Sequence, residues 1–456
     1  GALASPDPAR AFNPFGDGSH TNRAILEEIR SQQELRTHST VTSLNVTASG
    51  PVFALPAGDV KLAIGADVRN HAFEANVRVG DGPLNRVHND RDVQALFSEL
   101  YVPLVGEETA RRGLRKLELS LAARLENYSD FGETMTPRVG LAWSPLAGFS
   151  LRGSWAKSLR APSLYDLNEV NNVVSQLPVS TPGTAPGFAM VLVQSGKNAQ
   201  LQEERASSWT FGVDFTPEGI SDLSLAVTYF NVEFRDRISE LNFLDYDWLN
   251  DPSVAARVIF DPTAEQMSTA CASGQFSSSL GLGVPCGSTP VAAIIDVRKN
   301  NGWFLRTSGV DFSAKYTLGD FRFGLLGSYL LDYSEAMLEG TPLTEMQGTQ
   351  NNPVDLRMRG STTWQRGRLA ATGAVNFTDS YRDTQSQRHV SSWTTFDFGV
   401  AYTLGRTGAE TRFALNVENA FDEMPPFLNN AFGLGYDAEN GDLSGRIVSF
   451  QLRKNW

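Results

Sequence analysis

The stretch GRIVSFQLRKNW, residues 445–456, ends the chain on an alternating strand whose last residue is a tryptophan. Side chains alternate across a strand with period two. The apolar side of this strand consists of Val448, Phe450, Leu452 and Trp456. The polar side consists of Ser449, Gln451, Arg453 and Asn455, and only Ile447 and Lys454 break the pattern. A terminal residue ordinarily lies in a frayed polar tail. The pattern therefore indicates that an apolar medium covers one face of the strand up to its final residue.

Composition argues against several classes of protein. The chain has 456 residues, a net charge of −12 and five histidines. It has no basic block to neutralise phosphates, so we expect no nucleic-acid partner. It contains no HExxH, paired CxxC or GxxxxGK[ST] motif, and no apolar run reaches the ~18 residues that a membrane-spanning helix needs. We expect no catalytic residue, no metal ion and no cofactor, and we expect that the protein is not an enzyme.

The alternation of the last strand recurs throughout the chain. Clear examples are DVKLAIGADVR (59–69), LRKLELSLAARLENY (114–128), GVDFSAKYTLG (309–319) and TTFDFGVAYTL (394–404). We count about 15 strands of about ten residues or more, whereas soluble strands average about five or six. Aromatic residues gather near strand ends, at Trp143, Trp155, Tyr229, Tyr333, Phe377 and Phe421. A soluble antiparallel sandwich also alternates. Long strands with aromatic ends favour a different all-β fold, a transmembrane antiparallel β-barrel with an apolar outer face.

The linkers between these strands alternate between short and long. The short ones are 55–60, 144–149, 216–222, 318–320, 366–368 and 405–410, and the long ones cover about 161–203, 242–301, 338–354 and 422–444. Bacterial barrels have short periplasmic turns and longer outer loops. With the short turns in the periplasm, the last strand runs downward. Trp456 then lies at the periplasmic interface, where an amphipathic ring is favoured.

Four phrases of the sequence resemble the TonB-dependent outer-membrane receptors. Residues 137–167 are similar to a strand and hairpin that lead into a long outer loop, through Pro137, Arg138, Gly140, Trp143, Pro145, Arg160, Ala161, Pro162 and Ser163. Residues 201–215 resemble the next strand of the family, although KNAQLQEE stands where an N-P-x-L-x-P-E phrase is usual. The phrase before the last outer loop matches through Asn416, Asn419, Phe421 and Asp422. The terminal strand resembles the signal read by the barrel-assembly machinery, through Gly445, Val448, Phe450, Leu452 and Trp456.

The resemblance implies a larger barrel than this sequence supplies. Family members are barrels of about 22 strands with an N-terminal plug, whereas about 15 strands and neither plug nor TonB box are found here. Counted back from Trp456, the first strand, 41–55, would be the eighth, and residues 1–40 would be an outer-loop segment with a short helix at 20–33. The chain opens GALASPDPAR without methionine or signal peptide. We expect either that a second chain carries the plug and about seven strands after a cut in an exposed loop, or that the sequence is a fragment.

The resemblance also implies a function. It predicts a Gram-negative outer-membrane transporter that takes up a scarce solute, such as a siderophore, vitamin, sugar or peptide, with energy from the TonB complex acting through the plug. The expected partners are the plug-bearing part, the TonB complex, the barrel-assembly machinery, lipid and lipopolysaccharide. A passive porin-like channel and a surface receptor or adhesion barrel are the alternatives.

Few residues stand out as sites. Cys271 and Cys286 are the only cysteines and lie in the longest predicted outer loop, so an oxidising location favours a disulfide over two free thiols. The acidic segment 244–266 is either an outward-facing substrate or cation site or a solvated loop with a short helix capped by Asp251. Residues 435–445 are interpreted as a polar turn and not a calcium loop, because Gly441 occupies a ligand position.

Other side chains allow two interpretations. Arg138, Arg152, Arg357 and Arg359 are expected to face the lumen, where they either guide anionic ligands or pair with the plug or neighbouring strands. Trp248 and Trp303 suit stacking on a ligand ring and packing equally well. No substrate-binding residue can be assigned from the sequence.

Overall fold

The computed structural model describes residues 7, 23–29, 33–79, 84–167, 172–181, 187–220, 222–241, 248–250, 254–278, 285–337, 341–384, 386–406, 409–429 and 435–455. Its main element is a sixteen-stranded antiparallel sheet in which β16 (Thr344–Glu345) pairs only with β15. The other strands, in their order across the sheet, are β1 (Gln33–Leu55), β2 (Gly58–Val79), β3 (Asn85–Val105), β4 (Lys116–Tyr128), β5 (Gly132–Leu146), β6 (Phe149–Arg160), β9 (Glu204–Phe215), β10 (Leu223–Ser239), β14 (Asn300–Leu318), β15 (Phe321–Ala336), β17 (Leu356–Arg366), β18 (Leu369–Thr378), β21 (Trp393–Arg406), β22 (Ala409–Glu418) and β23 (Ile447–Lys454).

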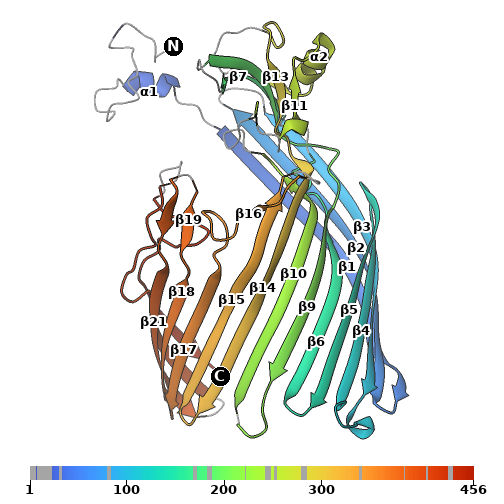
Figure 1. Cartoon of the computed structure of the whole chain (residues 1–456), viewed down its shortest axis with the longest axis vertical. Coiled ribbons are helices and arrows are strands. Elements are labelled where there is room, and N and C mark those ends of the chain that lie inside the picture. The colour runs from blue at the N-terminus through green and yellow to red at the C-terminus, as the bar shows by residue number, and fades with distance from the viewer. Residues whose placement is uncertain are drawn as a thin grey trace.

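This sheet forms the wall of a barrel, which confirms the predicted fold class. The strands are tilted and curve around a common axis (Figure 1). Within the described residues β1 pairs only with β2, and β23 pairs only with β22, so each presents one unpaired edge. The total of about 22 strands stays a prediction.

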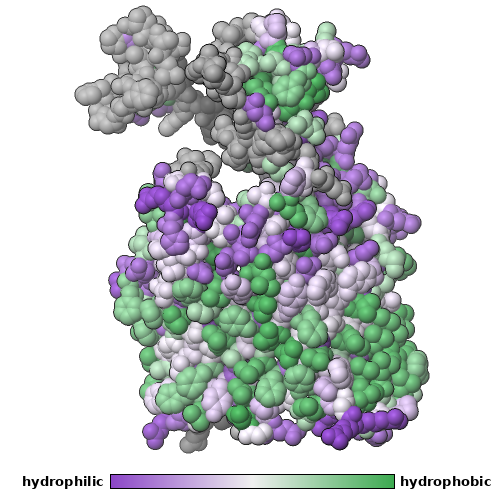
Figure 2. Space-filling view, viewed as in Figure 1, coloured by the Kyte–Doolittle hydropathy of each residue, from purple (hydrophilic) through white to green (hydrophobic). Residues whose placement is uncertain are grey.

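The outward face of the sheet is apolar and exposed. Leu96 is 63% exposed, Phe398 48% and Phe450 68%, although large apolar side chains of a soluble protein are mostly buried. A broad apolar surface covers the lower part of the visible face of the molecule, with polar residues above it and at the lower rim (Figure 2). Such a surface is stable against lipid and not against water. Neither described helix is long and apolar enough to cross a bilayer.

The first strand is longer than predicted. β1 starts at Gln33 and not near residue 41, and it stays in register with β2 from there. Residues 33–40, QELRTHST, have almost no apolar side chains, so alternation does not reveal them as a strand. β1, β2 and β3 rise above most of the wall (Figure 1). A short helix, α1 (Arg23–Ile29), lies within the segment where a helix was expected.

The two longest predicted loops are not simple loops. They fold together into a five-stranded outer sheet with the order β11-β13-β8-β7-β12. Its strands are β7 (Val173–Thr181), β8 (Gly187–Ser195), β11 (Val258–Phe260), β12 (Gln275–Ser278) and β13 (Ala293–Asp296), accompanied by the helix α2 (Ala264–Ala272) and the 3₁₀ turn Ala255–Arg257. Two of its pairings, β13 with β8 and β12 with β7, are parallel and join residues from different loops.

The outer sheet has its own apolar core. Val191, Val193, Trp248 and Ile295 are buried together on one side of it. Val174, Leu192, Ala270 and Ile294 form a second cluster, against which the disulfide Cys271–Cys286 packs. A further hairpin at this end of the barrel consists of β19 (Tyr381–Asp383) and β20 (Arg388–Val390). The sequence predicted no long loop in this segment. The turn Glu107–Thr109 follows β3.

Candidate functional site

The Arg-Ala-Pro-Ser step fixes the point at which the chain leaves β6. Arg160 lies opposite Glu204 of β9, whose side chain is fully buried. Its guanidinium donates to both carboxylate oxygens, with 2.6 Å from Nη2 to Oε1, and the Ile238 amide donates to Oε1 (2.7 Å). Pro162 is also fully buried. The step is therefore an anchor for the segment that follows.

The next residues form a turn on the lumen side of the wall. The amide of Asp166 donates to the carbonyl and to the hydroxyl of Ser163 (2.9 and 3.2 Å). Tyr165 packs edge-on against Phe73 of β2, with ring centroids 5.8 Å apart, and Asn89 of β3 donates to the Leu164 carbonyl (2.9 Å). Phe73 is an odd number of residues from outward-facing Val68, so period-two alternation places it on the lumen face.

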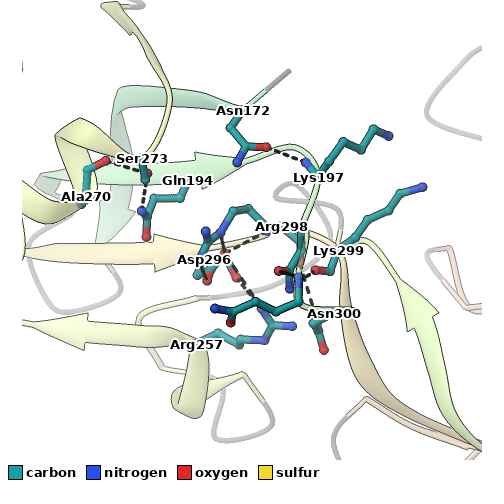
Figure 3. A network of polar contacts seen from close by, with 12 residues as sticks. Asn172, Gln194, Lys197, Arg257, Ala270, Ser273, Asp296, Arg298, Lys299 and Asn300 are labelled. Carbon is teal, nitrogen blue, oxygen red and sulfur yellow. Dashed lines mark hydrogen bonds and ion pairs between the residues drawn. The ribbon is translucent and has the colours of Figure 1, made fainter. Parts of the chain in front are cut away.

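Two segments far apart in the sequence lie side by side next to this turn. The Val297 amide donates to the Gln194 carbonyl (2.9 Å) and the Lys299 amide donates to the Gly196 carbonyl (3.2 Å). These bonds continue the parallel pairing of β8 with β13 and bring Lys197 next to Lys299. Both lysine side chains point to the same side, away from Gln194 and Ser273 (Figure 3).

The result is a compact group of polar residues, here called the mouth cluster: Tyr165, Asp166, Lys197, Asn198 and Lys299. Lys299 Nζ lies 2.6 Å from Asp166 Oδ1. Lys197 Nζ lies 3.8 Å from the centre of the Tyr165 ring, and Lys299 Nζ lies 6.0 Å from it. Asn198 holds the cluster together, because its amide donates to the Asp166 carbonyl (3.1 Å) and its side chain donates to the Lys299 carbonyl (3.1 Å).

Burial and neighbouring charges shift the ionisation of the cluster. Burial, together with the positive charge of Lys299, lowers the pKa of Lys197, which is only 8% exposed. Burial raises the pKa of Asp166, but hydrogen bonds from Lys299 and Ser163 outweigh it and hold that pKa below its usual value. Burial lowers the pKa of Lys299, and the bond to Asp166 outweighs this and raises it. The cluster therefore holds one ion pair and one additional ammonium group.

A second polar network joins the mouth cluster to the outer sheet. Arg298 donates twice to the carboxylate of Asp296 (2.9 and 2.7 Å), and the Lys197 amide donates to Asn172 Oδ1 (2.7 Å). Arg257 donates to the Asp296 carbonyl (3.4 Å), as Figure 3 shows. These bonds hold the strand ends and so fix where the two lysines project.

The arginines expected in the lumen contact neighbouring segments. Arg152 donates to Asp214 (2.9 Å) and Thr228 (2.5 Å), and Arg359 pairs with Asp397 (2.6 Å). Arg357 donates to the Glu439 carbonyl and the Asn440 side chain, both at 2.7 Å. Arg138 is exposed and lines a cavity of about 270 Å³. The paired arginines stabilise the wall.

The two tryptophans and the acidic segment named in the sequence analysis show no arrangement for binding a ligand in the described residues. Trp248 is 1% exposed inside the outer-sheet core, which favours packing over ligand stacking. The Arg237 guanidinium lies 5.4 Å from the Trp303 ring centre. Asp251 lies outside the described residues, and the helix found nearby, α2, is capped by Thr263 instead. Within the described ranges no three His, Cys, Asp or Glu side chains are grouped to hold a metal ion.

The structure also describes the predicted polar turn at 435–445 and most of the terminal strand. Asp437 is buried and accepts hydrogen bonds from the Asn351 amide, the Glu439 amide and the Asn440 side chain, so it organises a turn. In β23, Val448 and Leu452 are 62% and 59% exposed on the same outward face as Phe450. Gly445 precedes this strand with φ of +63°, and Trp456 lies outside the described residues. The role of these residues in barrel assembly stays a prediction.

Sequence reasoning missed all five members of the mouth cluster. A signal was present, because Tyr165 and Asp166 directly follow the Arg-Ala-Pro-Ser step. A Lys-Asn pair also occurs in two of the predicted long loops, at 197–198 and at 299–300. Nothing local shows that these two pairs meet.

Comparison with known proteins agrees with this architecture. Residues 5–420 match the family model described as TonB dependent receptor-like, beta-barrel. A ferric enterobactin receptor variant from Pseudomonas aeruginosa shares 13% identity and a TM-score of 0.59, over 92% of this chain and 54% of that one. The siderophore receptor PirA of Acinetobacter baumannii shares 14% identity and a TM-score of 0.61, over 92% and 55%.

A chain of the FpvAI–pyocin S2 complex shares 13% identity and a TM-score of 0.56, over 93% of this chain and 50% of that one. No curated protein matches the sequence. The chain spans about half the length of the solved receptors that it matches, and these identities establish likeness of fold alone. The match to the family model covers most of the sequence, and the chain belongs to the family of TonB-dependent receptor β-barrels, which are not enzymes.

Proposed function

We propose that this chain is the larger part of an outer-membrane importer that captures a scarce solute at its outer mouth and takes it up with energy from the TonB complex. The family resides in the outer membrane of Gram-negative bacteria. The observation that carries the proposal is the mouth cluster, a group of charged residues on the lumen side of the wall. We infer that a solute entering the barrel from outside passes this group.

The rest of the importer would be supplied by further strands and a plug. Each unpaired edge, on β1 and on β23, presents backbone groups that another strand can bond. We propose that about seven more strands connect these edges and that a plug fills the lumen. The plug would contact the TonB complex, and the apolar outer face would contact lipid and lipopolysaccharide. The barrel-assembly machinery would recognise β23.

A ferric siderophore is the first solute to test, because one similar structure is named as a ferric enterobactin receptor and another as a siderophore receptor. Cells that lack the gene would be compared with complemented cells for uptake of radiolabelled ferric siderophores, with and without a functional TonB complex. Uptake that needs both the gene and TonB supports the proposal. Uptake that needs the gene but not TonB indicates a passive channel. An unchanged uptake of siderophores, cobalamin and oligosaccharides after deletion favours a receptor or adhesion role.

The partner carrying the plug is tested separately. Native mass spectrometry of the complex extracted in mild detergent would be followed by the same measurement after denaturation. We expect a second polypeptide that stays bound until denaturation. If the native spectrum shows this chain alone at its own mass of 49.8 kDa, the proposal of a plugged, two-part transporter fails.

A further inference from the structure

We propose that the mouth cluster binds an anionic group of the incoming solute, a carboxylate or a phosphate, between the ammonium groups of Lys197 and Lys299. This inference rests on the proposed function, because it names the class of solute that the importer takes. Tyr165 would form the floor of the site, and Asp166 would hold Lys299 in place.

The first argument is the balance of charge. Lys299 has a carboxylate partner, Asp166, at 2.6 Å. Among the described residues no ion pair joins Lys197 to a carboxylate, and its Nζ lies 3.8 Å from the centre of the Tyr165 ring. The charges of Asp166 and Glu240 favour the ammonium form of Lys197, but burial and the charge of Lys299 outweigh them and lower its pKa. Lys197 as a whole is only 8% exposed, so its ammonium group loses part of its hydration, and a ring face replaces only part of that loss. A bound anion would give Lys197 a direct ionic partner.

The second argument is that the site is already formed. The backbone of Lys197 is held by Asn172 and that of Lys299 by Gly196 and Asn198. The two side chains project in parallel to the same side (Figure 3). Binding therefore requires little ordering of the backbone, and a single anionic group can accept hydrogen bonds from both ammonium groups.

The third argument concerns selectivity. The whole chain carries a net charge of −12, whereas the mouth cluster holds two ammonium groups and one carboxylate. A cationic solute would be repelled by the ammonium groups. A neutral sugar would also need acceptors, but the one carboxylate of the cluster is occupied by Lys299 and the Asn198 side chain by the Lys299 carbonyl. The chemistry selects an anion.

The test uses the complete receptor, purified with whatever chains accompany it. Equilibrium dialysis at low salt would measure the binding of two probes, inorganic phosphate and citrate. We expect saturable binding that falls at least tenfold in Lys197→Gln and in Lys299→Gln. Lys197→Arg, which keeps the charge, would retain binding. Lys157→Gln is the matched control, because Lys157 also lies near an aromatic ring, that of Trp155 at 6.0 Å, but is exposed. A preference for one probe identifies the anion as phosphate or carboxylate.

Several results would overturn the inference: no saturable binding to the wild type, or equal binding to wild type and Lys197→Gln, or an equal loss in the Lys157 control. Uptake assays separate this outcome from failure of the proposed function. Normal TonB-dependent uptake in both Gln variants rejects the anion site and leaves the importer intact. Saturable anion binding in a receptor whose deletion changes no uptake would retain the site and reject the importer.

Discussion

The most informative perturbation is the replacement of Arg160 by alanine. Glu204 is fully buried, and in the described structure its carboxylate is bonded by Arg160 and by the Ile238 amide. Removing the guanidinium leaves a buried negative charge with one backbone donor. Arg160 itself is 64% exposed, so the cost is that of leaving a buried carboxylate short of a donor, about 1–3 kcal/mol, and not that of breaking a fully buried pair. The folding equilibrium would therefore fall by roughly fivefold to a hundredfold.

A matched ion pair on the same two strands provides the control. Arg152 and Asp214 are joined across β6 and β9 at 2.9 Å, but their side chains are 43% and 39% exposed. Solvent screens such a pair, so Arg152→Ala should cost no more than about 1 kcal/mol. The difference between the two variants measures what burial contributes, because both remove an arginine from β6.

The assay is urea unfolding of the receptor in detergent micelles, followed by tryptophan fluorescence and linear extrapolation. We expect Arg160→Ala/Glu204→Gln to recover much of the loss, because glutamine removes the charge and still accepts from the Ile238 amide. Arg160→Ala should also weaken solute uptake, since the turn carrying Tyr165 starts three residues beyond it. The reasoning is refuted if Arg160→Ala is as stable as Arg152→Ala, or if the added Glu204 substitution recovers nothing.

Three further predictions test other parts of the molecule. In urea unfolding, Gly148→Ala should lower the stability of the receptor more than Gly367→Ala. Both glycines have positive φ, but only a Cβ at Gly148 would meet a backbone oxygen, at 2.1 Å. Equal losses of stability in the two variants would contradict this. Replacing both cysteines by serine should cost the outer sheet about 3 kcal/mol for a separation of 15 residues, seen as faster proteolysis of that sheet while the barrel stays intact. Phe450→Arg should cost about 2–4 kcal/mol and reduce the assembled receptor in outer-membrane fractions, whereas Ser449→Arg, on the lumen face, should be tolerated.

The barrel wall was predictable because its environment acts on every second residue. In β21, Phe398, Val400 and Tyr402 are 48%, 52% and 44% exposed, so the apolar side meets lipid at each step along the strand. A period of two is a local signal, and it survives without knowledge of the neighbouring strands. The signal ends where lipid ends, which is why the polar first part of β1 was not recognised as a strand.

The outer sheet was not predictable for the opposite reason. Val193 of β8 and Ile295 of β13 are buried in the same core, yet roughly a hundred residues separate them and the pairing is parallel. Short apolar runs of this kind do not alternate, and their pattern fits a buried strand, a helix or a loop anchor equally well. Cys271 and Cys286 were the exception, because an even number of cysteines in an oxidising location is informative without any fold.

The same contrast explains why the solute could not be read from the sequence. Lys197 and Lys299 are adjacent, Lys197 is buried and Lys299 is paired with Asp166, and each of these properties depends on how β8 and β13 pair. The membrane imposes a repeated local constraint on the wall, whereas recognition depends on contacts between distant segments. Changes in the outer segments can therefore alter which solute is bound without disturbing the alternation that defines the barrel. The mouth cluster, and not the motif that leads to it, is where specificity must be measured.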